Sequence, residues 1–193
     1  RYEIDESLFL RASQGIYYQQ PLEQEAAETY GNPDIKAPRA FHYTVGAEKD
    51  FRQGGSEGFK TNGGLFLKEF DRLVVPSVRF VERNGQQVAE NYNNNGLGRA
   101  YGFELQGSYD IKPWQFAVNY TWSRSVRWTP GEAERVAQFD QTHNLGLQMA
   151  YSKNNWRFSG RYRFVTGNPI TPIVGGVFDA DNDVYIPLRG GVY

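Results

Sequence analysis

The sequence predicts an all-β fold, an antiparallel meander of strands that run up and down. Three observations support this prediction. Apolar and polar residues alternate with a period of two along much of the chain, which is typical of strands with two different faces. Aromatic residues make up 16% of the 193 residues, and 21 residues are glycines, a composition that favours strands and turns. Short turns alternate with long connections, which would place every long connection at one end of the sheet.

Charge and cysteine content exclude several other classes of protein. Lys and Arg number 21 against 22 Asp and Glu, so the chain lacks the excess of positive charge that nucleic-acid binding requires. It contains no cysteine, which excludes disulfide scaffolds, zinc fingers and thiol catalysis. No stretch approaches the ~20 apolar residues of a membrane-spanning helix, and a disordered chain would contain fewer aromatic residues.

The alternation is clearest in residues 115–126, where Phe116 and Val118 share one face and Asn119 lies on the other. The alternation slips over residues 66–70, which predicts a bulge there. The same pattern, at varying strength, predicts strands over 7–19, 41–51, 59–75, 99–111, 144–152 and 155–166, and a last strand that begins near Val184 and continues to the end of the chain.

Connections rich in Gly, Pro and Asn separate these strands, and a short helix is predicted over residues 26–30. Because backbone polar groups in lipid must be satisfied internally, a closed sheet with an apolar outer face and a polar inner face suits a membrane. The meander is therefore typical of a transmembrane β-barrel, and a soluble β-sandwich with an aromatic core is the alternative. The predicted turns are 52–58, 110–114 and 152–155, and the predicted long loops are 20–39, 76–96, 129–138 and 168–183.

Residues on the inner face of such a barrel meet water and can be charged, whereas outer residues meet hydrocarbon. Aromatic rings near strand ends are typical of the two membrane interfaces. Gly96, Gly98 and Gly102 are predicted to allow close backbone approach. The residues predicted to face the lumen are Arg99, Glu104, Asn119, Arg157, Arg161 and Arg163. Those predicted to face lipid or to belong to the aromatic girdles are Tyr120, Trp122, Trp128, Trp156 and Phe158.

No residue is predicted to be catalytic or to bind a cofactor or a metal ion, and the chain is not expected to be an enzyme. Asp140 and His143 are three positions apart, so on one strand they would face opposite sides. Hydrogen bonding at the rim of the barrel is the role predicted for both. The D-x-D-x-D run at 179–183 lacks the glycine and the distal glutamate of a calcium-binding loop, and it is predicted to be a polar loop tip.

Five phrases in the sequence resemble the TonB-dependent outer-membrane receptor family, in the order and at the spacing of that family. They are QGIYYQQP at 14–21, NNGLGRAYGFEL at 94–105, NYTWSRS at 119–125, FDQTHNL at 139–145 and TGNPITP at 166–172. Each phrase is weak alone, but together they extend the resemblance over essentially the whole chain.

The resemblance implies a barrel of about 22 strands, of which residues 1–193 are a late part of the barrel domain. The family's N-terminal plug, its TonB box and the final strands would lie outside this stretch. A stretch of this kind is expected to be an open, curved sheet in which residues 7–19 do not pair with 155–166 or 184–193.

The function implied by the resemblance is active uptake of a scarce ligand, of the siderophore, cobalamin or glycan type. The implied location is the outer membrane of a Gram-negative bacterium. The expected partners are outer-membrane lipid, the TonB system acting through the plug, and a small-molecule ligand at the extracellular loops, with no nucleic acid and no cofactor. Two alternatives are a passive porin-like or small self-contained outer-membrane barrel, and a soluble β-sheet binding protein.

Overall fold

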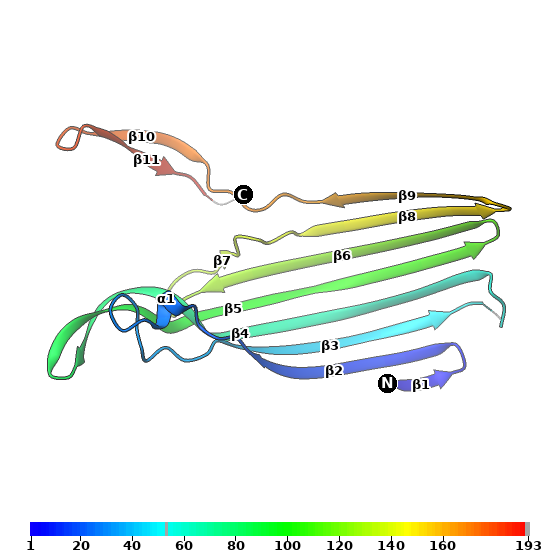
Figure 1. The fold of residues 1–193 in the computed structure, drawn as a ribbon, viewed down its shortest axis with the longest axis horizontal. Coiled ribbons are helices and arrows are strands. Elements are labelled where there is room, and N and C mark those ends of the chain that lie inside the picture. Colours follow the sequence, from blue (N-terminus) through cyan, green and yellow to red (C-terminus); the bar gives the residue numbers. More distant parts are fainter. Residues whose placement is uncertain (53, 192–193) are drawn as a thin grey trace.

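The structure is a computed structural model that describes residues 1–52 and 54–191. One broad antiparallel sheet contains most of the chain, and its main strands follow one another in chain order (Figure 1). The all-β up-and-down meander predicted from the sequence is therefore confirmed. The strands of this sheet are β1 (Tyr2–Asp5), β2 (Leu8–Tyr18), β3 (Arg39–Asp50), β4 (Gly58–Arg83), β5 (Gln86–Ile111), β6 (Trp114–Trp128), β7 (Arg135–Val136), β8 (His143–Lys153) and β9 (Trp156–Val165).

The large sheet is open. Its edges are β1 and β9, while β2 lies between β1 and β3. Within the described ranges no ladder joins residues 7–19 to 155–166 or to 184–191, so the predicted open sheet is confirmed. The edge strand is β1 and not the strand predicted at 7–19, because residues 2–5 fold back on β2. The predicted continuation of the last strand into residues 192–193 lies outside the described residues.

The prediction of a loop over 76–96 was wrong. The β4 and β5 strands continue past the ends of their neighbours and meet at a tight turn (Figure 1), in which Asn84 and Gly85 have φ of 52° and 77°. Positive φ at both turn residues is typical of a two-residue hairpin. Toward the hairpin, Leu97 is the outermost residue of β5 that pairs with β6, and Asp71 is the outermost residue of β4 that pairs with β3. Beyond that level the hairpin pairs with no other strand of the described ranges, and its own ladder shifts register between Ser77 and Phe80.

Residues 168–183 also contain a strand where a loop was predicted. The strands β10 (Ile173–Asp179) and β11 (Val184–Arg189) form a separate two-stranded sheet. The bulge predicted over 66–70 lies at the C-terminal end of that range. The register of the β4–β5 ladder shifts between Phe70 and Leu73, where Arg72 has φ of 55°. The short helix lies slightly earlier than predicted, as α1 (Glu23–Ala26). No helix in the described part of the chain is long and apolar enough to cross a membrane.

The large sheet has one apolar and one polar face. Side chains alternate along each strand and match across each ladder, so Tyr120, Leu145 and Phe164 share a face, as consecutive partners on β6, β8 and β9. The opposite face carries Asn119, Gly146 and Arg163 in the same way. Val126 is the one apolar residue of the described ranges that is buried, at 8% exposure. The sheet therefore lacks a hydrophobic core of its own, and its apolar face needs an apolar environment.

Candidate functional site

Three of the five sequence phrases meet at one end of β6, β8 and β9. The Tyr120 hydroxyl is 2.7 Å from Nδ1 of His143, which links the phrase on β6 to the start of β8. The backbone N–H of Ser123 donates to the carbonyl of Thr142 at 3.0 Å. The third phrase joins through Thr166, whose hydroxyl accepts from the His143 N–H at 3.0 Å. Residues distant in the sequence therefore form one hydrogen-bond network at the rim of the sheet.

Asp140 anchors the loop before β8 in this network. Its side chain is 2% exposed, and one carboxylate oxygen accepts from the Ser125 N–H at 2.6 Å. The other oxygen is 3.3 Å from a guanidinium nitrogen of Arg124. Asp140 and His143 thus have the hydrogen-bonding role predicted for them. The two residues do not lie on opposite faces of one strand, because β8 begins at His143 and Asp140 precedes it.

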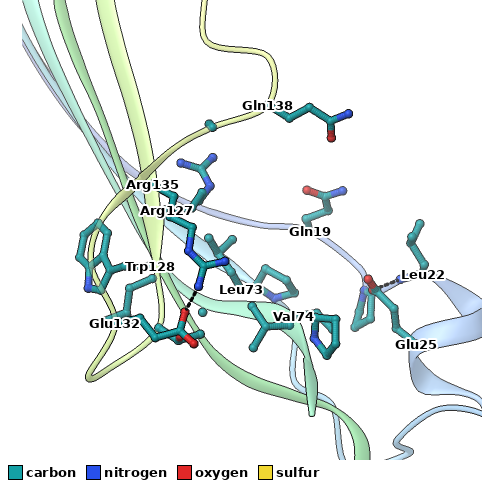
Figure 2. A pocket seen from close by; sticks show the side chains of 18 of the residues that line it. Gln19, Leu22, Glu25, Leu73, Val74, Arg127, Trp128, Glu132, Arg135 and Gln138 are labelled. Atoms are coloured by element: carbon teal, nitrogen blue, oxygen red, sulfur yellow. Dashed lines mark hydrogen bonds and ion pairs between the residues drawn. The ribbon is translucent and has the colours of Figure 1, made fainter. Parts of the chain in front are cut away.

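A pocket of about 750 Å³ lies at the same end of the sheet. Its wall comes from four separate segments, namely the connection after β2, the bulged part of β4, Gly96 and Leu97 of β5, and the end of β6 with the loop that follows (Figure 2). That loop returns to the sheet because β7 pairs with β6, with Arg135 opposite Arg127 and Val136 opposite Val126. The lining residues include Gln19, Gln20, Pro21, Leu22, Glu25, Pro38, Leu73, Val75, Pro76, Arg127, Trp128, Glu132, Arg135, Val136 and Gln138.

Arg127 is held in a fixed position in this pocket. Phe70, Gly98 and Arg127 are consecutive ladder partners on β4, β5 and β6. The guanidinium crosses Gly98, where a Cβ would lie 2.6 Å from Cδ of Arg127, and its carbon is 4.3 Å from the centre of the Phe70 ring. Its Nη1 donates to Ser125 Oγ at 3.2 Å and to the Val126 carbonyl at 3.0 Å. No sequence signal singles out Arg127, because it lies two positions after the phrase at 119–125 and resembles any other strand arginine.

The other charged groups of the pocket already have partners. Arg135 forms an ion pair with Glu132, drawn as a dashed line in Figure 2. The Glu25 carboxylate accepts from the Leu22 N–H at 2.8 Å. Among the described residues Arg127 has no carboxylate within ion-pair distance. Arg127 is therefore the one arginine of the pocket without a carboxylate partner among the described residues, and Glu25 is a carboxylate of the same pocket without a cationic partner there.

Most of the residues predicted for the lumen share the polar face. Arg99 lies on the opposite face. It is five positions from Glu104 along an uninterrupted ladder, and residues an odd number of positions apart on a strand face opposite sides. The joint prediction of a lumenal location for Arg99 and Glu104 was therefore wrong. The Arg99 guanidinium instead lies 5.7 Å from the Trp128 ring. The predicted lumen residues that share the polar face are Glu104, Asn119, Arg157, Arg161 and Arg163.

The predicted girdle and lipid-facing residues all share the apolar face. Trp128 ends β6 at the pocket end of the sheet. Trp156 begins β9 at the opposite end, where its ring stacks on Phe158 with centroids 5.7 Å apart. Trp122 stacks on Phe103 at 6.0 Å. The predicted residues that lie on this face are Tyr120, Trp122, Trp128, Trp156 and Phe158.

In the described part of the chain no three His, Asp or Glu side chains are grouped so as to hold a metal ion. Asp179 instead accepts from the Asp181 N–H at 3.1 Å and from the Asn182 amide at 2.8 Å. These bonds close the tip of the β10–β11 hairpin. The predicted polar loop tip is thus confirmed for 179–183.

Two of the three glycines predicted to allow close backbone approach, Gly96 and Gly102, do so, whereas Gly98 leaves room for the Arg127 side chain. A Cβ at Gly96 would lie 2.7 Å from the Leu73 carbonyl oxygen. A Cβ at Gly102 would fall on the Trp122 carbonyl oxygen and lie 2.8 Å from the Phe66 ring. Neither site has room for a side chain.

Comparison with known proteins identifies the architecture. A family model described as "TonB dependent receptor-like, beta-barrel" matches residues 1–187. The FrpB iron transporter from Neisseria meningitidis is similar in structure, with a TM-score of 0.64 and 16% identity, over 100% of this chain and 29% of that one. The ferripyoverdine receptor of the Pseudomonas aeruginosa outer membrane has a TM-score of 0.62 and 13% identity, over 100% of this chain and 24% of that one. The chain thus spans about a quarter of the length of these proteins, and no curated protein matches it.

Proposed function

This chain belongs to the TonB-dependent receptor family as part of its β-barrel, and we propose that it forms a stretch of barrel wall in a receptor that actively imports a scarce ligand. The receptor would lie in the outer membrane of a Gram-negative bacterium. The family consists of transport receptors rather than enzymes. The chain would contribute wall, lumen surface and loops, while the TonB system would act through a plug domain of the same receptor.

The contrast between the two sheet faces carries this proposal. Large apolar side chains such as Phe158 and Tyr162 are 56% and 58% exposed on one face. In water such a face would favour aggregation, whereas in a bilayer it is the expected outer surface of a barrel. We assign this face to lipid, and the opposite face, with Glu104, Asn119 and Arg161, to the lumen.

The pocket end of the sheet would be extracellular. It carries the long connections and the β4–β5 hairpin, and outer-membrane barrels have their long loops outside and their short turns in the periplasm. The ligand would then reach the pocket from outside the cell. Siderophores, cobalamin and glycans are the candidate ligand types, and a ferric chelate is the first to test, since the two similar structures are named for an iron transporter and a ferripyoverdine receptor.

Uptake in matched strains tests the proposal. The gene for the full-length receptor is deleted and restored in the source bacterium, with and without TonB, and accumulation of radioactive iron from a panel of ferric chelates is measured. We expect accumulation of at least one chelate to require both the receptor and TonB. Receptor-dependent uptake that persists without TonB would instead support the passive porin-like barrel, and recovery of the receptor in the soluble fraction would support the soluble β-protein.

A further inference from the structure

We infer that the pocket of Figure 2 binds an organic anion with an apolar body, whose negatively charged group pairs with Arg127. The inference rests on the proposed function, because it assigns a chemical class to the ligand that the receptor would take up. It is carried by the guanidinium of Arg127, which has no carboxylate partner among the described residues, and by the chemical contrast between the pocket walls.

The Arg127 guanidinium has more hydrogen-bond donors than partners in the described part of the chain. Only Nη1 has protein partners in the described ranges, and both are neutral oxygens. The donors on Nε and Nη2 have no partner there. A half-buried guanidinium without a counter-ion is unfavourable, and a planar anion such as a carboxylate can accept two parallel hydrogen bonds from it. A bound anion would therefore supply the partner that the folded chain does not.

The guanidinium is also pre-organised for such a ligand. It lies over the Phe70 ring at 4.3 Å, a favourable arrangement of a cation on an aromatic ring. Gly98 leaves the space through which the side chain passes. Because the side chain is already ordered, binding an anion would lose less conformational entropy than binding to a mobile arginine.

The remaining walls describe the rest of the ligand. Leu73, Val75 and Pro76 line one side, and Trp128 lines another. Amide side chains are available for orienting hydrogen bonds, as Figure 2 shows for Gln19 and Gln138. The volume of about 750 Å³ is within the range of small-molecule sites. The combination fits a cyclic or aromatic organic anion better than a small inorganic ion.

The test uses two probes that differ in charge. Purified full-length receptor in lipid nanodiscs is dialysed against 2-naphthoate or against its neutral analogue 2-naphthamide, and empty nanodiscs provide the background. We expect the receptor to bind 2-naphthoate at least tenfold more tightly than 2-naphthamide. Arg127→Gln should weaken 2-naphthoate binding about tenfold or more and leave 2-naphthamide binding unchanged.

Heat-modifiable gel mobility shows whether Arg127→Gln assembles. If it does not, further variants test the inference. Arg127→Lys should retain part of the preference for the anion. Glu132→Gln should tighten 2-naphthoate binding, because it frees Arg135 from its ion pair. The control is Arg79→Gln, which removes an exposed arginine outside the pocket and should change nothing. Equal binding of both probes, full anion affinity in Arg127→Gln, or no gain in Glu132→Gln would each overturn the inference.

The dialysis requires neither TonB nor transport, so its outcome is separable from that of the uptake experiment. Arg127-dependent anion binding in a receptor whose uptake ignores TonB would contradict the proposed function alone. TonB-dependent uptake in a receptor that binds the two naphthalene probes equally would contradict the anion pocket alone.

Discussion

The guanidinium of Arg127 stacks on the ring of Phe70 at 4.3 Å although the two residues lie on strands that are not neighbours. The contact crosses β5 at Gly98, the ladder partner of both residues. Any side chain at that position would separate them. A glycine on the middle strand therefore determines where the pocket cation lies.

Replacing two of the β5 glycines by alanine should have different consequences. In Gly98→Ala the new Cβ meets the flexible Arg127 side chain, which can move, so we expect a stability loss below about 1 kcal/mol together with weaker binding of 2-naphthoate. In Gly102→Ala it meets the Trp122 backbone oxygen, which cannot move without breaking the ladder. A loss of about 1–3 kcal/mol or more is expected. Urea titration of the full-length receptor measures both, and equal losses would contradict the assigned difference.

Arginine substitutions on adjacent β6 residues should separate the two faces. Val118 lies on the apolar face near the middle of β6, and Asn119 lies on the polar face. An arginine facing lipid near the midplane costs about 2–4 kcal/mol, whereas one in the lumen costs little. Val118→Arg should therefore lower the free energy of unfolding far more than Asn119→Arg. Similar effects in a refolding titration would mean that the apolar face is not in lipid.

Removal of the Asp140 carboxylate should release the loop that lines the pocket. Asp140→Ala leaves the Ser125 N–H without its acceptor and Arg124 without its counter-ion. We expect a loss of about 1–3 kcal/mol and faster proteolysis within residues 129–138. Glu134→Ala is the matched control, because Glu134 is exposed on the same loop. If both variants are cleaved at the wild-type rate, Asp140 does not anchor the loop.

Cysteine labelling should establish the orientation of the sheet. Val78 is 96% exposed on the β4–β5 hairpin, and Ser56 is exposed in the turn between β3 and β4 at the other end. The stretch has no cysteine of its own. In the full-length receptor, a membrane-impermeant maleimide should label Val78→Cys on intact cells and Ser56→Cys only after permeabilisation. The reverse pattern would invert the proposed topology.

The sequence predicted the part of the fold in which chemistry alternates along a strand. The segments at 115–126, 144–152 and 155–166 became β6, β8 and β9 with nearly the predicted bounds. In these strands every second side chain must be apolar, and this alternation can be read directly from the residue types. The hairpin over 76–96 was missed although Val78 and Phe80 alternate with Ser77 and Arg79, because its other side is the polar run QQVAENYNNN at 86–95.

The candidate site was predicted only as separate phrases. The phrases that contain Tyr120, Asp140 and Thr166 were all noticed, but their convergence depends on β8 and β9 pairing next to β6. The error at Arg99 has the same origin, because the face of a strand residue depends on an uninterrupted register that only the ladder shows.

The sequence by itself determined the family, the two-faced sheet and the absence of cysteine chemistry, since each depends on residue type and local spacing. The tertiary structure decided which residues form the pocket, because Phe70, Gly98 and Arg127 meet only once three strands are in register. It also decided which arginine of the pocket has no carboxylate partner, because the pairing of Arg135 with Glu132 is set by the folded loop. Register and loop closure place residues distant in the sequence within a few ångströms of one another, and no local pattern encodes that distance.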